Sequence, residues 1–169
     1  MAGPLNRRTV LDRLLGLATP WAALIPFLPG GQADAAAAAG DPAWSLSEAQ
    51  WRARLSPAAF EVLRREGTER PFSSALNGEK RPGTFVCAGC ALPLFSSRNK
   101  YDSGTGWPSF WEALPGGVAT RTDFKLIVPR TEYHCRRCGG HQGHVFNDGP
   151  RPTGKRYCNN GVALKFLPA

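Results

Sequence analysis

Two short segments, Cys87-Ala88-Gly89-Cys90 and Cys135-Arg136-Arg137-Cys138, carry the strongest structural signal in this 169-residue chain. Each Cys-x-x-Cys turn brings two thiolates close together, and two such turns supply the four sulfur ligands of a tetrahedral zinc ion at about 2.3 Å. Zinc sites made only of cysteine are usually structural. We therefore predict that these four cysteines bind one zinc ion that staples the fold. A redox-active dithiol or two disulfides are the alternatives for the same thiols.

The fifth cysteine, Cys158, has no partner in this arrangement, because an odd number of cysteines cannot pair completely. A lone cysteine is more often a small buried apolar residue than a nucleophile. Its neighbours favour reactivity here: Arg156 can stabilise a thiolate electrostatically, and Asn160 can donate a hydrogen bond to a developing charge. We predict a reactive thiol at Cys158.

Two histidines, His141 and His144, flank Gln142-Gly143 in a glycine-rich stretch. They could be metal ligands, polar loop residues or acid/base groups. Because four cysteines already complete a zinc shell, the acid/base role is favoured. Trp107 follows Gly106 and is either a core residue or a ring presented to a ligand.

The composition favours one mainly β domain with short elements. The chain has 19 Gly and 15 Pro, which is typical of many turns. Strand-like runs lie at 84–86, 124–128 and 161–166. Before them, Ser47 and Ser56 are candidate N-caps of two short helices, with Gly67 as the stop of the second.

The formal net charge of +8 comes from Lys and Arg that are spread along the chain with no run longer than a pair. Scattered charge favours a solvated basic surface over a nucleic-acid interface, so we expect no nucleic-acid partner.

The first 35 residues resemble an export signal. Arg7-Arg8 precede an apolar stretch at 14–28, and Ala33-Asp34-Ala35 has the pattern that a signal peptidase reads. The paired arginines resemble a twin-arginine signal, with a general secretory signal as the alternative. The stretch is short for a bilayer span and contains two prolines, so we expect cleavage after Ala35 and no stable membrane span. Residues 36–43 are then a flexible leader, residues 44–169 form the domain, and the protein is periplasmic.

Several motifs together resemble the B-type methionine sulfoxide reductases, from about Trp51 to Phe166. They are Gly67-Thr68-Glu69-Arg70-Pro71-Phe72, Phe95-Ser96-Ser97, Tyr101-Asp102-Ser103-Gly104-Thr105-Gly106-Trp107-Pro108-Ser109-Phe110, His141-Gln142-Gly143-His144-Val145-Phe146 and Arg156-Tyr157-Cys158-Asn159-Asn160. The resemblance implies two small antiparallel sheets with N-terminal helices, a structural zinc, and reduction of the R epimer of methionine sulfoxide, free or in oxidised proteins.

The resemblance also assigns roles to residues. It makes Cys158 the nucleophile and Trp107 the ring that receives the substrate methyl group. The polar partners of the sulfoxide oxygen are His141, His144 and Asn160, and the supporting residues are Phe146 and Arg156. Of the histidines, we expect His144 to supply the proton, while His141 and Asn160 orient it. Attack then leaves methionine and a cysteine sulfenic acid.

One position departs from many members of the family. Thr105 stands where they have a resolving cysteine, and no sixth cysteine replaces it. We therefore expect its sulfenic acid to be reduced by an external thiol, from a thioredoxin-like protein or another reductant. We also expect the protein to be a monomer. Two other function classes stay open: an exported zinc-ribbon binding module, and a thiol-disulfide oxidoreductase using Cys87 and Cys90.

Overall fold

The computed structural model describes residues 41–125 and 127–169. The predicted signal segment 1–35 and residues 36–40 of the predicted leader lie outside the described residues. The described part begins with a short 3-10 turn, Pro42–Trp44. The Asp41 amide before it donates to the Arg137 carbonyl at 2.8 Å, so the chain is held at the second Cys-x-x-Cys turn from this point on.

Two short helices follow, and their N-terminal caps agree with the sequence. Helix α1 (Glu48–Arg54) starts at Ser47, which forms a capping box with Gln50. Helix α2 (Pro57–Arg65) starts at the Ser56 cap with proline at its first position. Its end differs from the prediction: Glu66, not Gly67, takes the left-handed conformation, with φ 55°.

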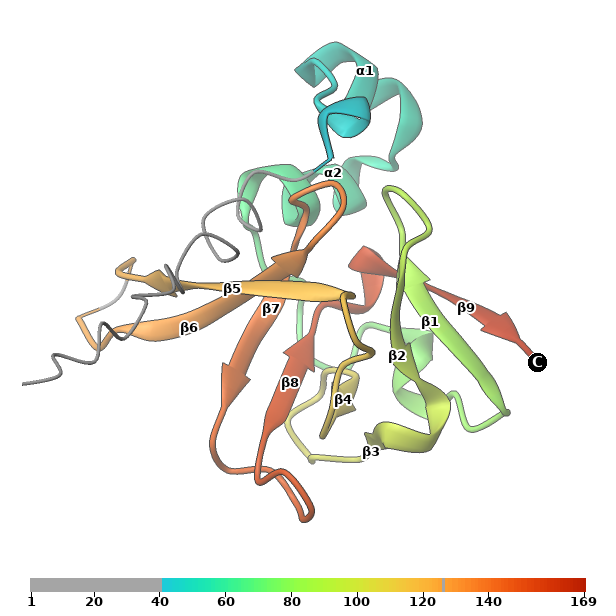
Figure 1. Ribbon diagram of the computed structural model, residues 1–169, viewed down its shortest axis with the longest axis vertical. Helices are drawn as coiled ribbons and strands as arrows, with labels where there is room; N and C mark the ends of the chain where they lie inside the picture. The colour runs from blue at the N-terminus through green and yellow to red at the C-terminus, as the bar shows by residue number, and fades with distance from the viewer. Residues whose placement is uncertain (1–40, 126) are drawn as a thin grey trace, which may run out of the picture. The chain divides into compact units, whose positions relative to one another are not determined.

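The rest of the described chain forms two antiparallel sheets, seen in Figure 1. The smaller sheet has the order β2-β1-β9 and the larger the order β3-β4-β8-β7-β6-β5. The strands are β1 (Gly83–Cys87), β2 (Pro93–Ser96), β3 (Lys100–Tyr101), β4 (Ser109–Phe110), β5 (Val118–Asp123), β6 (Arg130–Cys135), β7 (His141–Phe146), β8 (Arg156–Asn159) and β9 (Leu164–Pro168). The predicted class, mainly β with two small antiparallel sheets and short N-terminal helices, is confirmed.

Two of the three predicted strands need correction. The apolar run 124–128 is the connection between β5 and β6, where Phe124, Ile127 and Val128 are exposed. The Asp123 carboxylate accepts the Lys125 amide at 2.8 Å, which turns the chain out of the ladder directly after β5. The run 161–166 starts with a 3-10 turn, and strand β9 begins only at Leu164.

The segments that carry His141, His144 and Cys158 are strands of the larger sheet, and none of the predicted strand-like runs included them. Their sequences lack an apolar alternation because several of their buried side chains are polar, including His141, Gln142 and Asn159.

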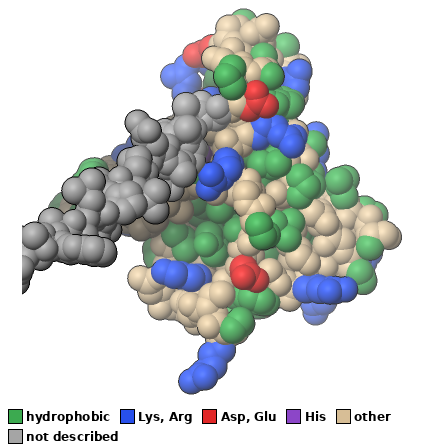
Figure 2. Space-filling model, viewed as in Figure 1, with side chains coloured by type: hydrophobic (Ala, Val, Ile, Leu, Met, Phe, Trp, Pro, Cys, Tyr) green, Lys and Arg blue, Asp and Glu red, His purple; other side chains and the backbone are tan. Residues whose placement is uncertain are grey.

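The core joins the helices to both sheets. The aromatic rings of Phe85, Phe95, Phe110 and Tyr133 are fully buried, and Leu63 of α2 and the four paired cysteines are buried with them. Over the described ranges 41–125 and 127–169, no helix is long and apolar enough to cross a membrane. Lys and Arg side chains occupy several separate places on the face shown in Figure 2.

Candidate active site

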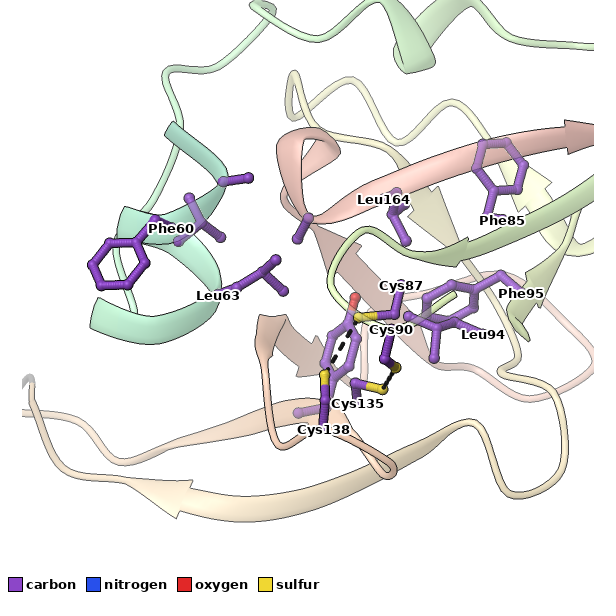
Figure 3. Close-up of a cluster of buried hydrophobic side chains, with 14 of the residues drawn as sticks. Phe60, Leu63, Phe85, Cys87, Cys90, Leu94, Phe95, Cys135, Cys138 and Leu164 are labelled. Atoms are coloured by element: carbon purple, nitrogen blue, oxygen red, sulfur yellow. Dashed lines mark hydrogen bonds between the residues drawn. The ribbon is translucent and has the colours of Figure 1, made fainter. Parts of the chain in front are cut away.

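The four paired cysteines converge at one buried point between the two sheets. Cys87 and Cys90 lie at the end of β1 and in the turn that follows it, whereas Cys135 and Cys138 lie at the end of β6 and in its turn. Figure 3 shows the sulfurs facing one another across these turns. All four Sγ atoms lie within 4.8 Å of one another.

The sulfur spacing fits a metal better than disulfides. The Cys87–Cys138 and Cys90–Cys135 Sγ atoms are 3.7 and 3.4 Å apart, well beyond a bond of about 2.05 Å. A tetrahedral ion with sulfur at about 2.3 Å requires S–S distances of roughly 3.8 Å. The Gln142 amide approaches the Cys87 sulfur at 3.4 Å, as an outer-shell donor does. These cysteines therefore form a site that can hold a metal ion.

The fifth cysteine lies in the interior of the larger sheet. Cys158 of β8 pairs with Ser109 of β4 on one side and with His144 of β7 on the other. The close approach of β7 requires a glycine, because a Cβ on Gly143 would lie 1.9 Å from the Cys158 carbonyl oxygen. The sheet thereby places the thiol beside the histidine strand.

A chain of hydroxyl groups ends on the Cys158 sulfur. Ser109 Oγ is 2.7 Å from Ser103 Oγ, which is 2.8 Å from Thr105 Oγ1, and this last oxygen lies 4.0 Å from Cys158 Sγ. Each hydroxyl can donate and accept, so the chain can be oriented with Thr105 donating to a thiolate. Burial raises the pKa of Cys158 above 9.0, while Thr105 and the positive charge of Arg156 oppose that rise.

His144 is held by a carboxylate from the neighbouring hairpin. Its Nε2 lies 2.7 Å from Asp123 Oδ2, and Arg130 also binds that oxygen at 2.7 Å. Burial lowers the pKa of His144 below 6.5, although Asp123 acts to raise it. The Lys125 amide and His144 together hold the pKa of Asp123 well below 3.8. Asp123 thus stays ionised and orients the imidazole.

His141 has a separate carboxylate partner. Its Nδ1 lies 2.8 Å from Glu132 Oε1, and the same carboxylate contacts His134 at 3.1 Å and Arg121 at 3.0 Å. Burial alone would raise the pKa of Glu132, but its histidine hydrogen bonds outweigh burial and lower it to about 2. The His141 and His144 ring centroids are 5.5 Å apart, so the two histidines stand side by side.

Asn160 and Trp107 are both tied to the segment before the smaller sheet. Asn160 Oδ1 accepts the Glu69 amide at 3.0 Å, and its Nδ2 donates to the Gln142 carbonyl at 3.0 Å. The Trp107 Nε1 donates to the Glu69 carbonyl at 3.1 Å. Both ends of the Asn160 amide therefore hold the backbone in place, and the indole orientation is fixed.

Arg156 and Phe146 are paired directly across β8 and β7, at one end of that strand pair. Arg156 makes two hydrogen bonds of 2.8 Å to Asp148, and its guanidinium lies 4.3 Å from the Phe146 ring centroid. The preceding residue, Lys155, donates to the Asn147 side chain at 2.6 Å.

These groups surround a small pocket of about 140 Å³. Five of the predicted residues line it, namely Cys158, His144, Asn160, Trp107 and Phe146. His141 and Arg156 do not line it: the His141 ring lies beside that of His144, and the Arg156 guanidinium lies over the Phe146 ring. The volume is below the roughly 300–1,000 Å³ of sites for larger ligands, so the pocket suits a single side chain.

Several residues of the site have no local signal in the sequence. Asp123, Arg130 and Glu132 reach it through the pairing of β5, β6 and β7. Glu69 reaches it from the segment after α2, through backbone hydrogen bonds with Asn160 and Trp107. Arg130 also lines the pocket, and its buried Nε has no hydrogen-bond partner within the described residues. The sequence alone does not show which carboxylates contact the histidines, because these contacts form only when β5, β6 and β7 pair side by side.

Comparison with known proteins identifies the family. The SelR domain family matches residues 55–168. The chain belongs to the methionine-R-sulfoxide reductase B family. A peptide methionine sulfoxide reductase MsrB of Leptospira interrogans is 50% identical over 121 residues, which cover 71% of this chain and 92% of that protein.

Two eukaryotic relatives are equally similar. The chloroplastic peptide methionine sulfoxide reductase B1 of Arabidopsis thaliana is 50% identical over 72% of this chain, and the aligned part spans 61% of the relative's length. The mitochondrial methionine-R-sulfoxide reductase B2 of Rattus norvegicus is 50% identical over 74% of this chain and 76% of its own. Membership makes the chain an oxidoreductase, and it favours the reductase over the zinc-ribbon module and the dithiol oxidoreductase.

Proposed function

We propose that this protein reduces the R epimer of methionine sulfoxide to methionine, with Cys158 as the nucleophile. The observation that carries the proposal is one small pocket that combines a thiol, an imidazole and an indole ring: Cys158, His144 and Trp107. A sulfoxide needs a soft nucleophile on sulfur and a proton on oxygen. The pocket supplies both groups.

The chemical step moves oxygen from the substrate to the enzyme. The Cys158 thiolate attacks the sulfoxide sulfur while His144 protonates the oxygen. Because Nε2 of His144 is engaged by Asp123, Nδ1 is the nitrogen that gives the proton. Collapse releases methionine and leaves Cys158 as a sulfenic acid, so the substrate is reduced by two electrons and the cysteine is oxidised by two.

Selectivity for one epimer follows from the two unlike walls of the pocket. Trp107 and Phe146 are apolar, whereas His144 and Asn160 are polar. The R epimer places its methyl group on the indole and its oxygen toward the histidine. Exchanging the two substituents strands a polar oxygen against an apolar ring, which costs about 1–3 kcal/mol.

The metal of the four-cysteine site is, in our proposal, zinc with a structural role. Its supporting observations are the four buried cysteines, whose sulfurs lie within 4.8 Å of one another, and the Sγ–Sγ distances of 3.7 and 3.4 Å, which are close to those of a tetrahedral site. Bound zinc supplies a cross-link between the sheets rather than a reactive centre.

The oxidised enzyme needs an external reductant in this scheme. Thr105 provides a hydroxyl next to Cys158, and a hydroxyl does not resolve a sulfenic acid as a thiol does. We propose a thioredoxin-like protein or another thiol as the donor, and a monomeric enzyme. We also propose export to the periplasm, supported by Arg7-Arg8 and Ala33-Asp34-Ala35; replacing both arginines by lysine should leave uncleaved precursor inside the cell.

The decisive experiment is a single turnover with each epimer of N-acetyl-methionine sulfoxide and no reductant. We expect one equivalent of methionine product from the R epimer, a dimedone-trapped sulfenic acid on Cys158, and no intramolecular disulfide by mass spectrometry. The Cys158→Ser variant should give no product. Turnover by that variant, or equal turnover of the S epimer, would disprove the proposal.

A further inference from the structure

A second, larger hollow lies beside the pocket and has no role in the chemistry described above. Its volume is about 610 Å³, and Phe72, Asn77, Lys100 and Trp107 contribute to its walls. Trp107 also lines the small pocket, so this one side chain belongs to both. We call this hollow the flanking groove.

An exposed aromatic ring marks the edge of the flanking groove. Phe72 is 73% exposed and adopts φ 63°, a left-handed conformation that is unfavourable for a bulky residue. Its amide donates to the Gly106 carbonyl at 2.7 Å, and its ring covers Gly106 so closely that an added Cβ would lie 2.9 Å from it. A strained backbone that holds an apolar ring in solvent is typical of ligand-contacting positions.

The groove also contains a half-buried ammonium group. Lys100 Nζ donates to the Asn77 carbonyl at 2.8 Å, and no carboxylate lies within 4.0 Å of it in the described part of the chain. The acidic groups nearby have other partners: Glu79 is paired with Arg81, and Asp102 accepts the Gly104 amide. An ammonium has three donors, so Lys100 can bind a further acceptor.

We propose that the flanking groove binds the polypeptide next to an oxidised methionine, with an apolar side chain against Phe72 and an acidic side chain at Lys100. This inference rests on the proposed function. The catalytic pocket holds one side chain, so the main chain of a polypeptide substrate must continue across its rim. Trp107 lines both the pocket and the flanking groove, so a main chain that leaves the pocket past Trp107 enters the groove. Free methionine sulfoxide has no flanking residues and would leave the groove empty.

The test compares three substrates that share one methionine-R-sulfoxide. The first is a peptide with phenylalanine and aspartate beside the sulfoxide, the second replaces the aspartate by lysine, and the third is N-acetyl-methionine-R-sulfoxide, which has no flanks. For the wild-type enzyme we expect a kcat/KM about three- to tenfold higher for the acidic peptide than for the basic one, the range of a partly buried ion pair. Added salt should reduce this preference.

Variants test which residues cause the preference for the acidic peptide. Lys100→Met should remove it, Lys100→Arg should retain it, and the matched control Lys165→Met, which changes an exposed residue of β9, should leave it intact. Phe72→Ala should lower kcat/KM for both peptides relative to the amino-acid substrate. Metal content and circular dichroism of each variant report its folding.

The outcomes separate the two proposals. Equal kcat/KM values for the acidic and basic peptides with the wild-type enzyme would contradict the groove proposal, whatever the variants do. A preference for the acidic peptide that survives Lys100→Met would contradict it as well. Failure to reduce any of the three substrates contradicts the proposed function instead.

Discussion

At the scale of single residues, Thr105 shapes the reactivity of the nucleophile. Its hydroxyl is 4.0 Å from the Cys158 sulfur and lies at the end of a chain through Ser103 and Ser109. Burial makes the Cys158 thiolate unfavourable, and Thr105 is one of the two residues that counter this effect. The Thr105 hydroxyl therefore acts directly on the ionisation of the nucleophile.

Replacing Thr105 by valine keeps the shape of the side chain and removes its hydroxyl. We expect the pKa of Cys158 to rise further and the thiolate fraction at pH 7 to fall about two- to tenfold, as for loss of one neutral hydrogen bond. The pH dependence of iodoacetamide modification, with Cys158→Ser as the background, measures this. Thr105→Ser should behave like wild type. An unchanged profile for Thr105→Val would show that the hydroxyl does not contact the thiolate.

At the scale of elements, the β5–β6 hairpin supplies the electrostatic support of the histidine. Asp123 ends β5, Arg130 begins β6, and both reach the pocket side of β7, where Asp123 binds His144. The mechanism requires a protonated His144 and an ionised Cys158. The pKa of His144 is lowered and that of Cys158 is raised, so the reactive form is a minor but constant fraction of the enzyme at any pH between the two pKa values. We therefore expect kcat/KM to be flat in that range, to fall below the pKa of His144 and to fall above the pKa of Cys158.

Asp123→Asn tests the role of this hairpin. Asp123 raises the pKa of His144, so its loss lowers that pKa further. The acid limb of kcat/KM should move to lower pH, and the plateau should fall about five- to tenfold for a change near one pKa unit. Asparagine can still accept the Lys125 amide, which preserves the turn. Asp41→Asn is a charge-matched control in the N-terminal turn. An acid limb that stays in place would exclude His144 as its origin.

At the scale of the whole described domain, the four-cysteine site connects the two sheets. One Cys-x-x-Cys turn follows β1 of the smaller sheet, and the other follows β6 of the larger sheet. The amide of Gln142, a residue of β7, contacts Cys87, so the metal site and the histidine strand are in direct contact. Loss of the metal should therefore disturb the fold and the active site together.

Cys135→Ser should abolish metal binding and cooperative folding at once. Structural zinc sites contribute about 10–16 kcal/mol to folding, as much as the 5–15 kcal/mol net stability of an ordinary domain. Metal analysis and thermal unfolding provide the measurement. Cys158→Ser is the matched control, because it should keep the metal and the melting temperature while losing activity. A folded, metal-free and active Cys135→Ser protein would contradict a structural role.

Local patterns in the sequence were sufficient for the elements whose physics is local. Ser47 and Ser56 cap their helices through amides three residues away, and each Cys-x-x-Cys pair forms within one turn. The number and spacing of the cysteines are enough to separate the two Cys-x-x-Cys pairs from the unpaired Cys158. The same reasoning failed at 124–128, where an apolar run predicted a strand although the side chain of Asp123 turns the chain away from the ladder.

The tertiary structure alone decided how the active site is assembled. Asp123 and Glu132 become partners of His144 and His141 only through the pairing of β6 with β5 and β7, and Glu69 reaches Asn160 and Trp107 across a long sequence separation. No short-range periodicity encodes such contacts, because they depend on strand register and on which faces of the sheets are buried together. Strands β7 and β8 could not be predicted from an apolar alternation, because several of their buried side chains are polar. Hydrogen-bond partners far away in the sequence make the burial of these side chains favourable.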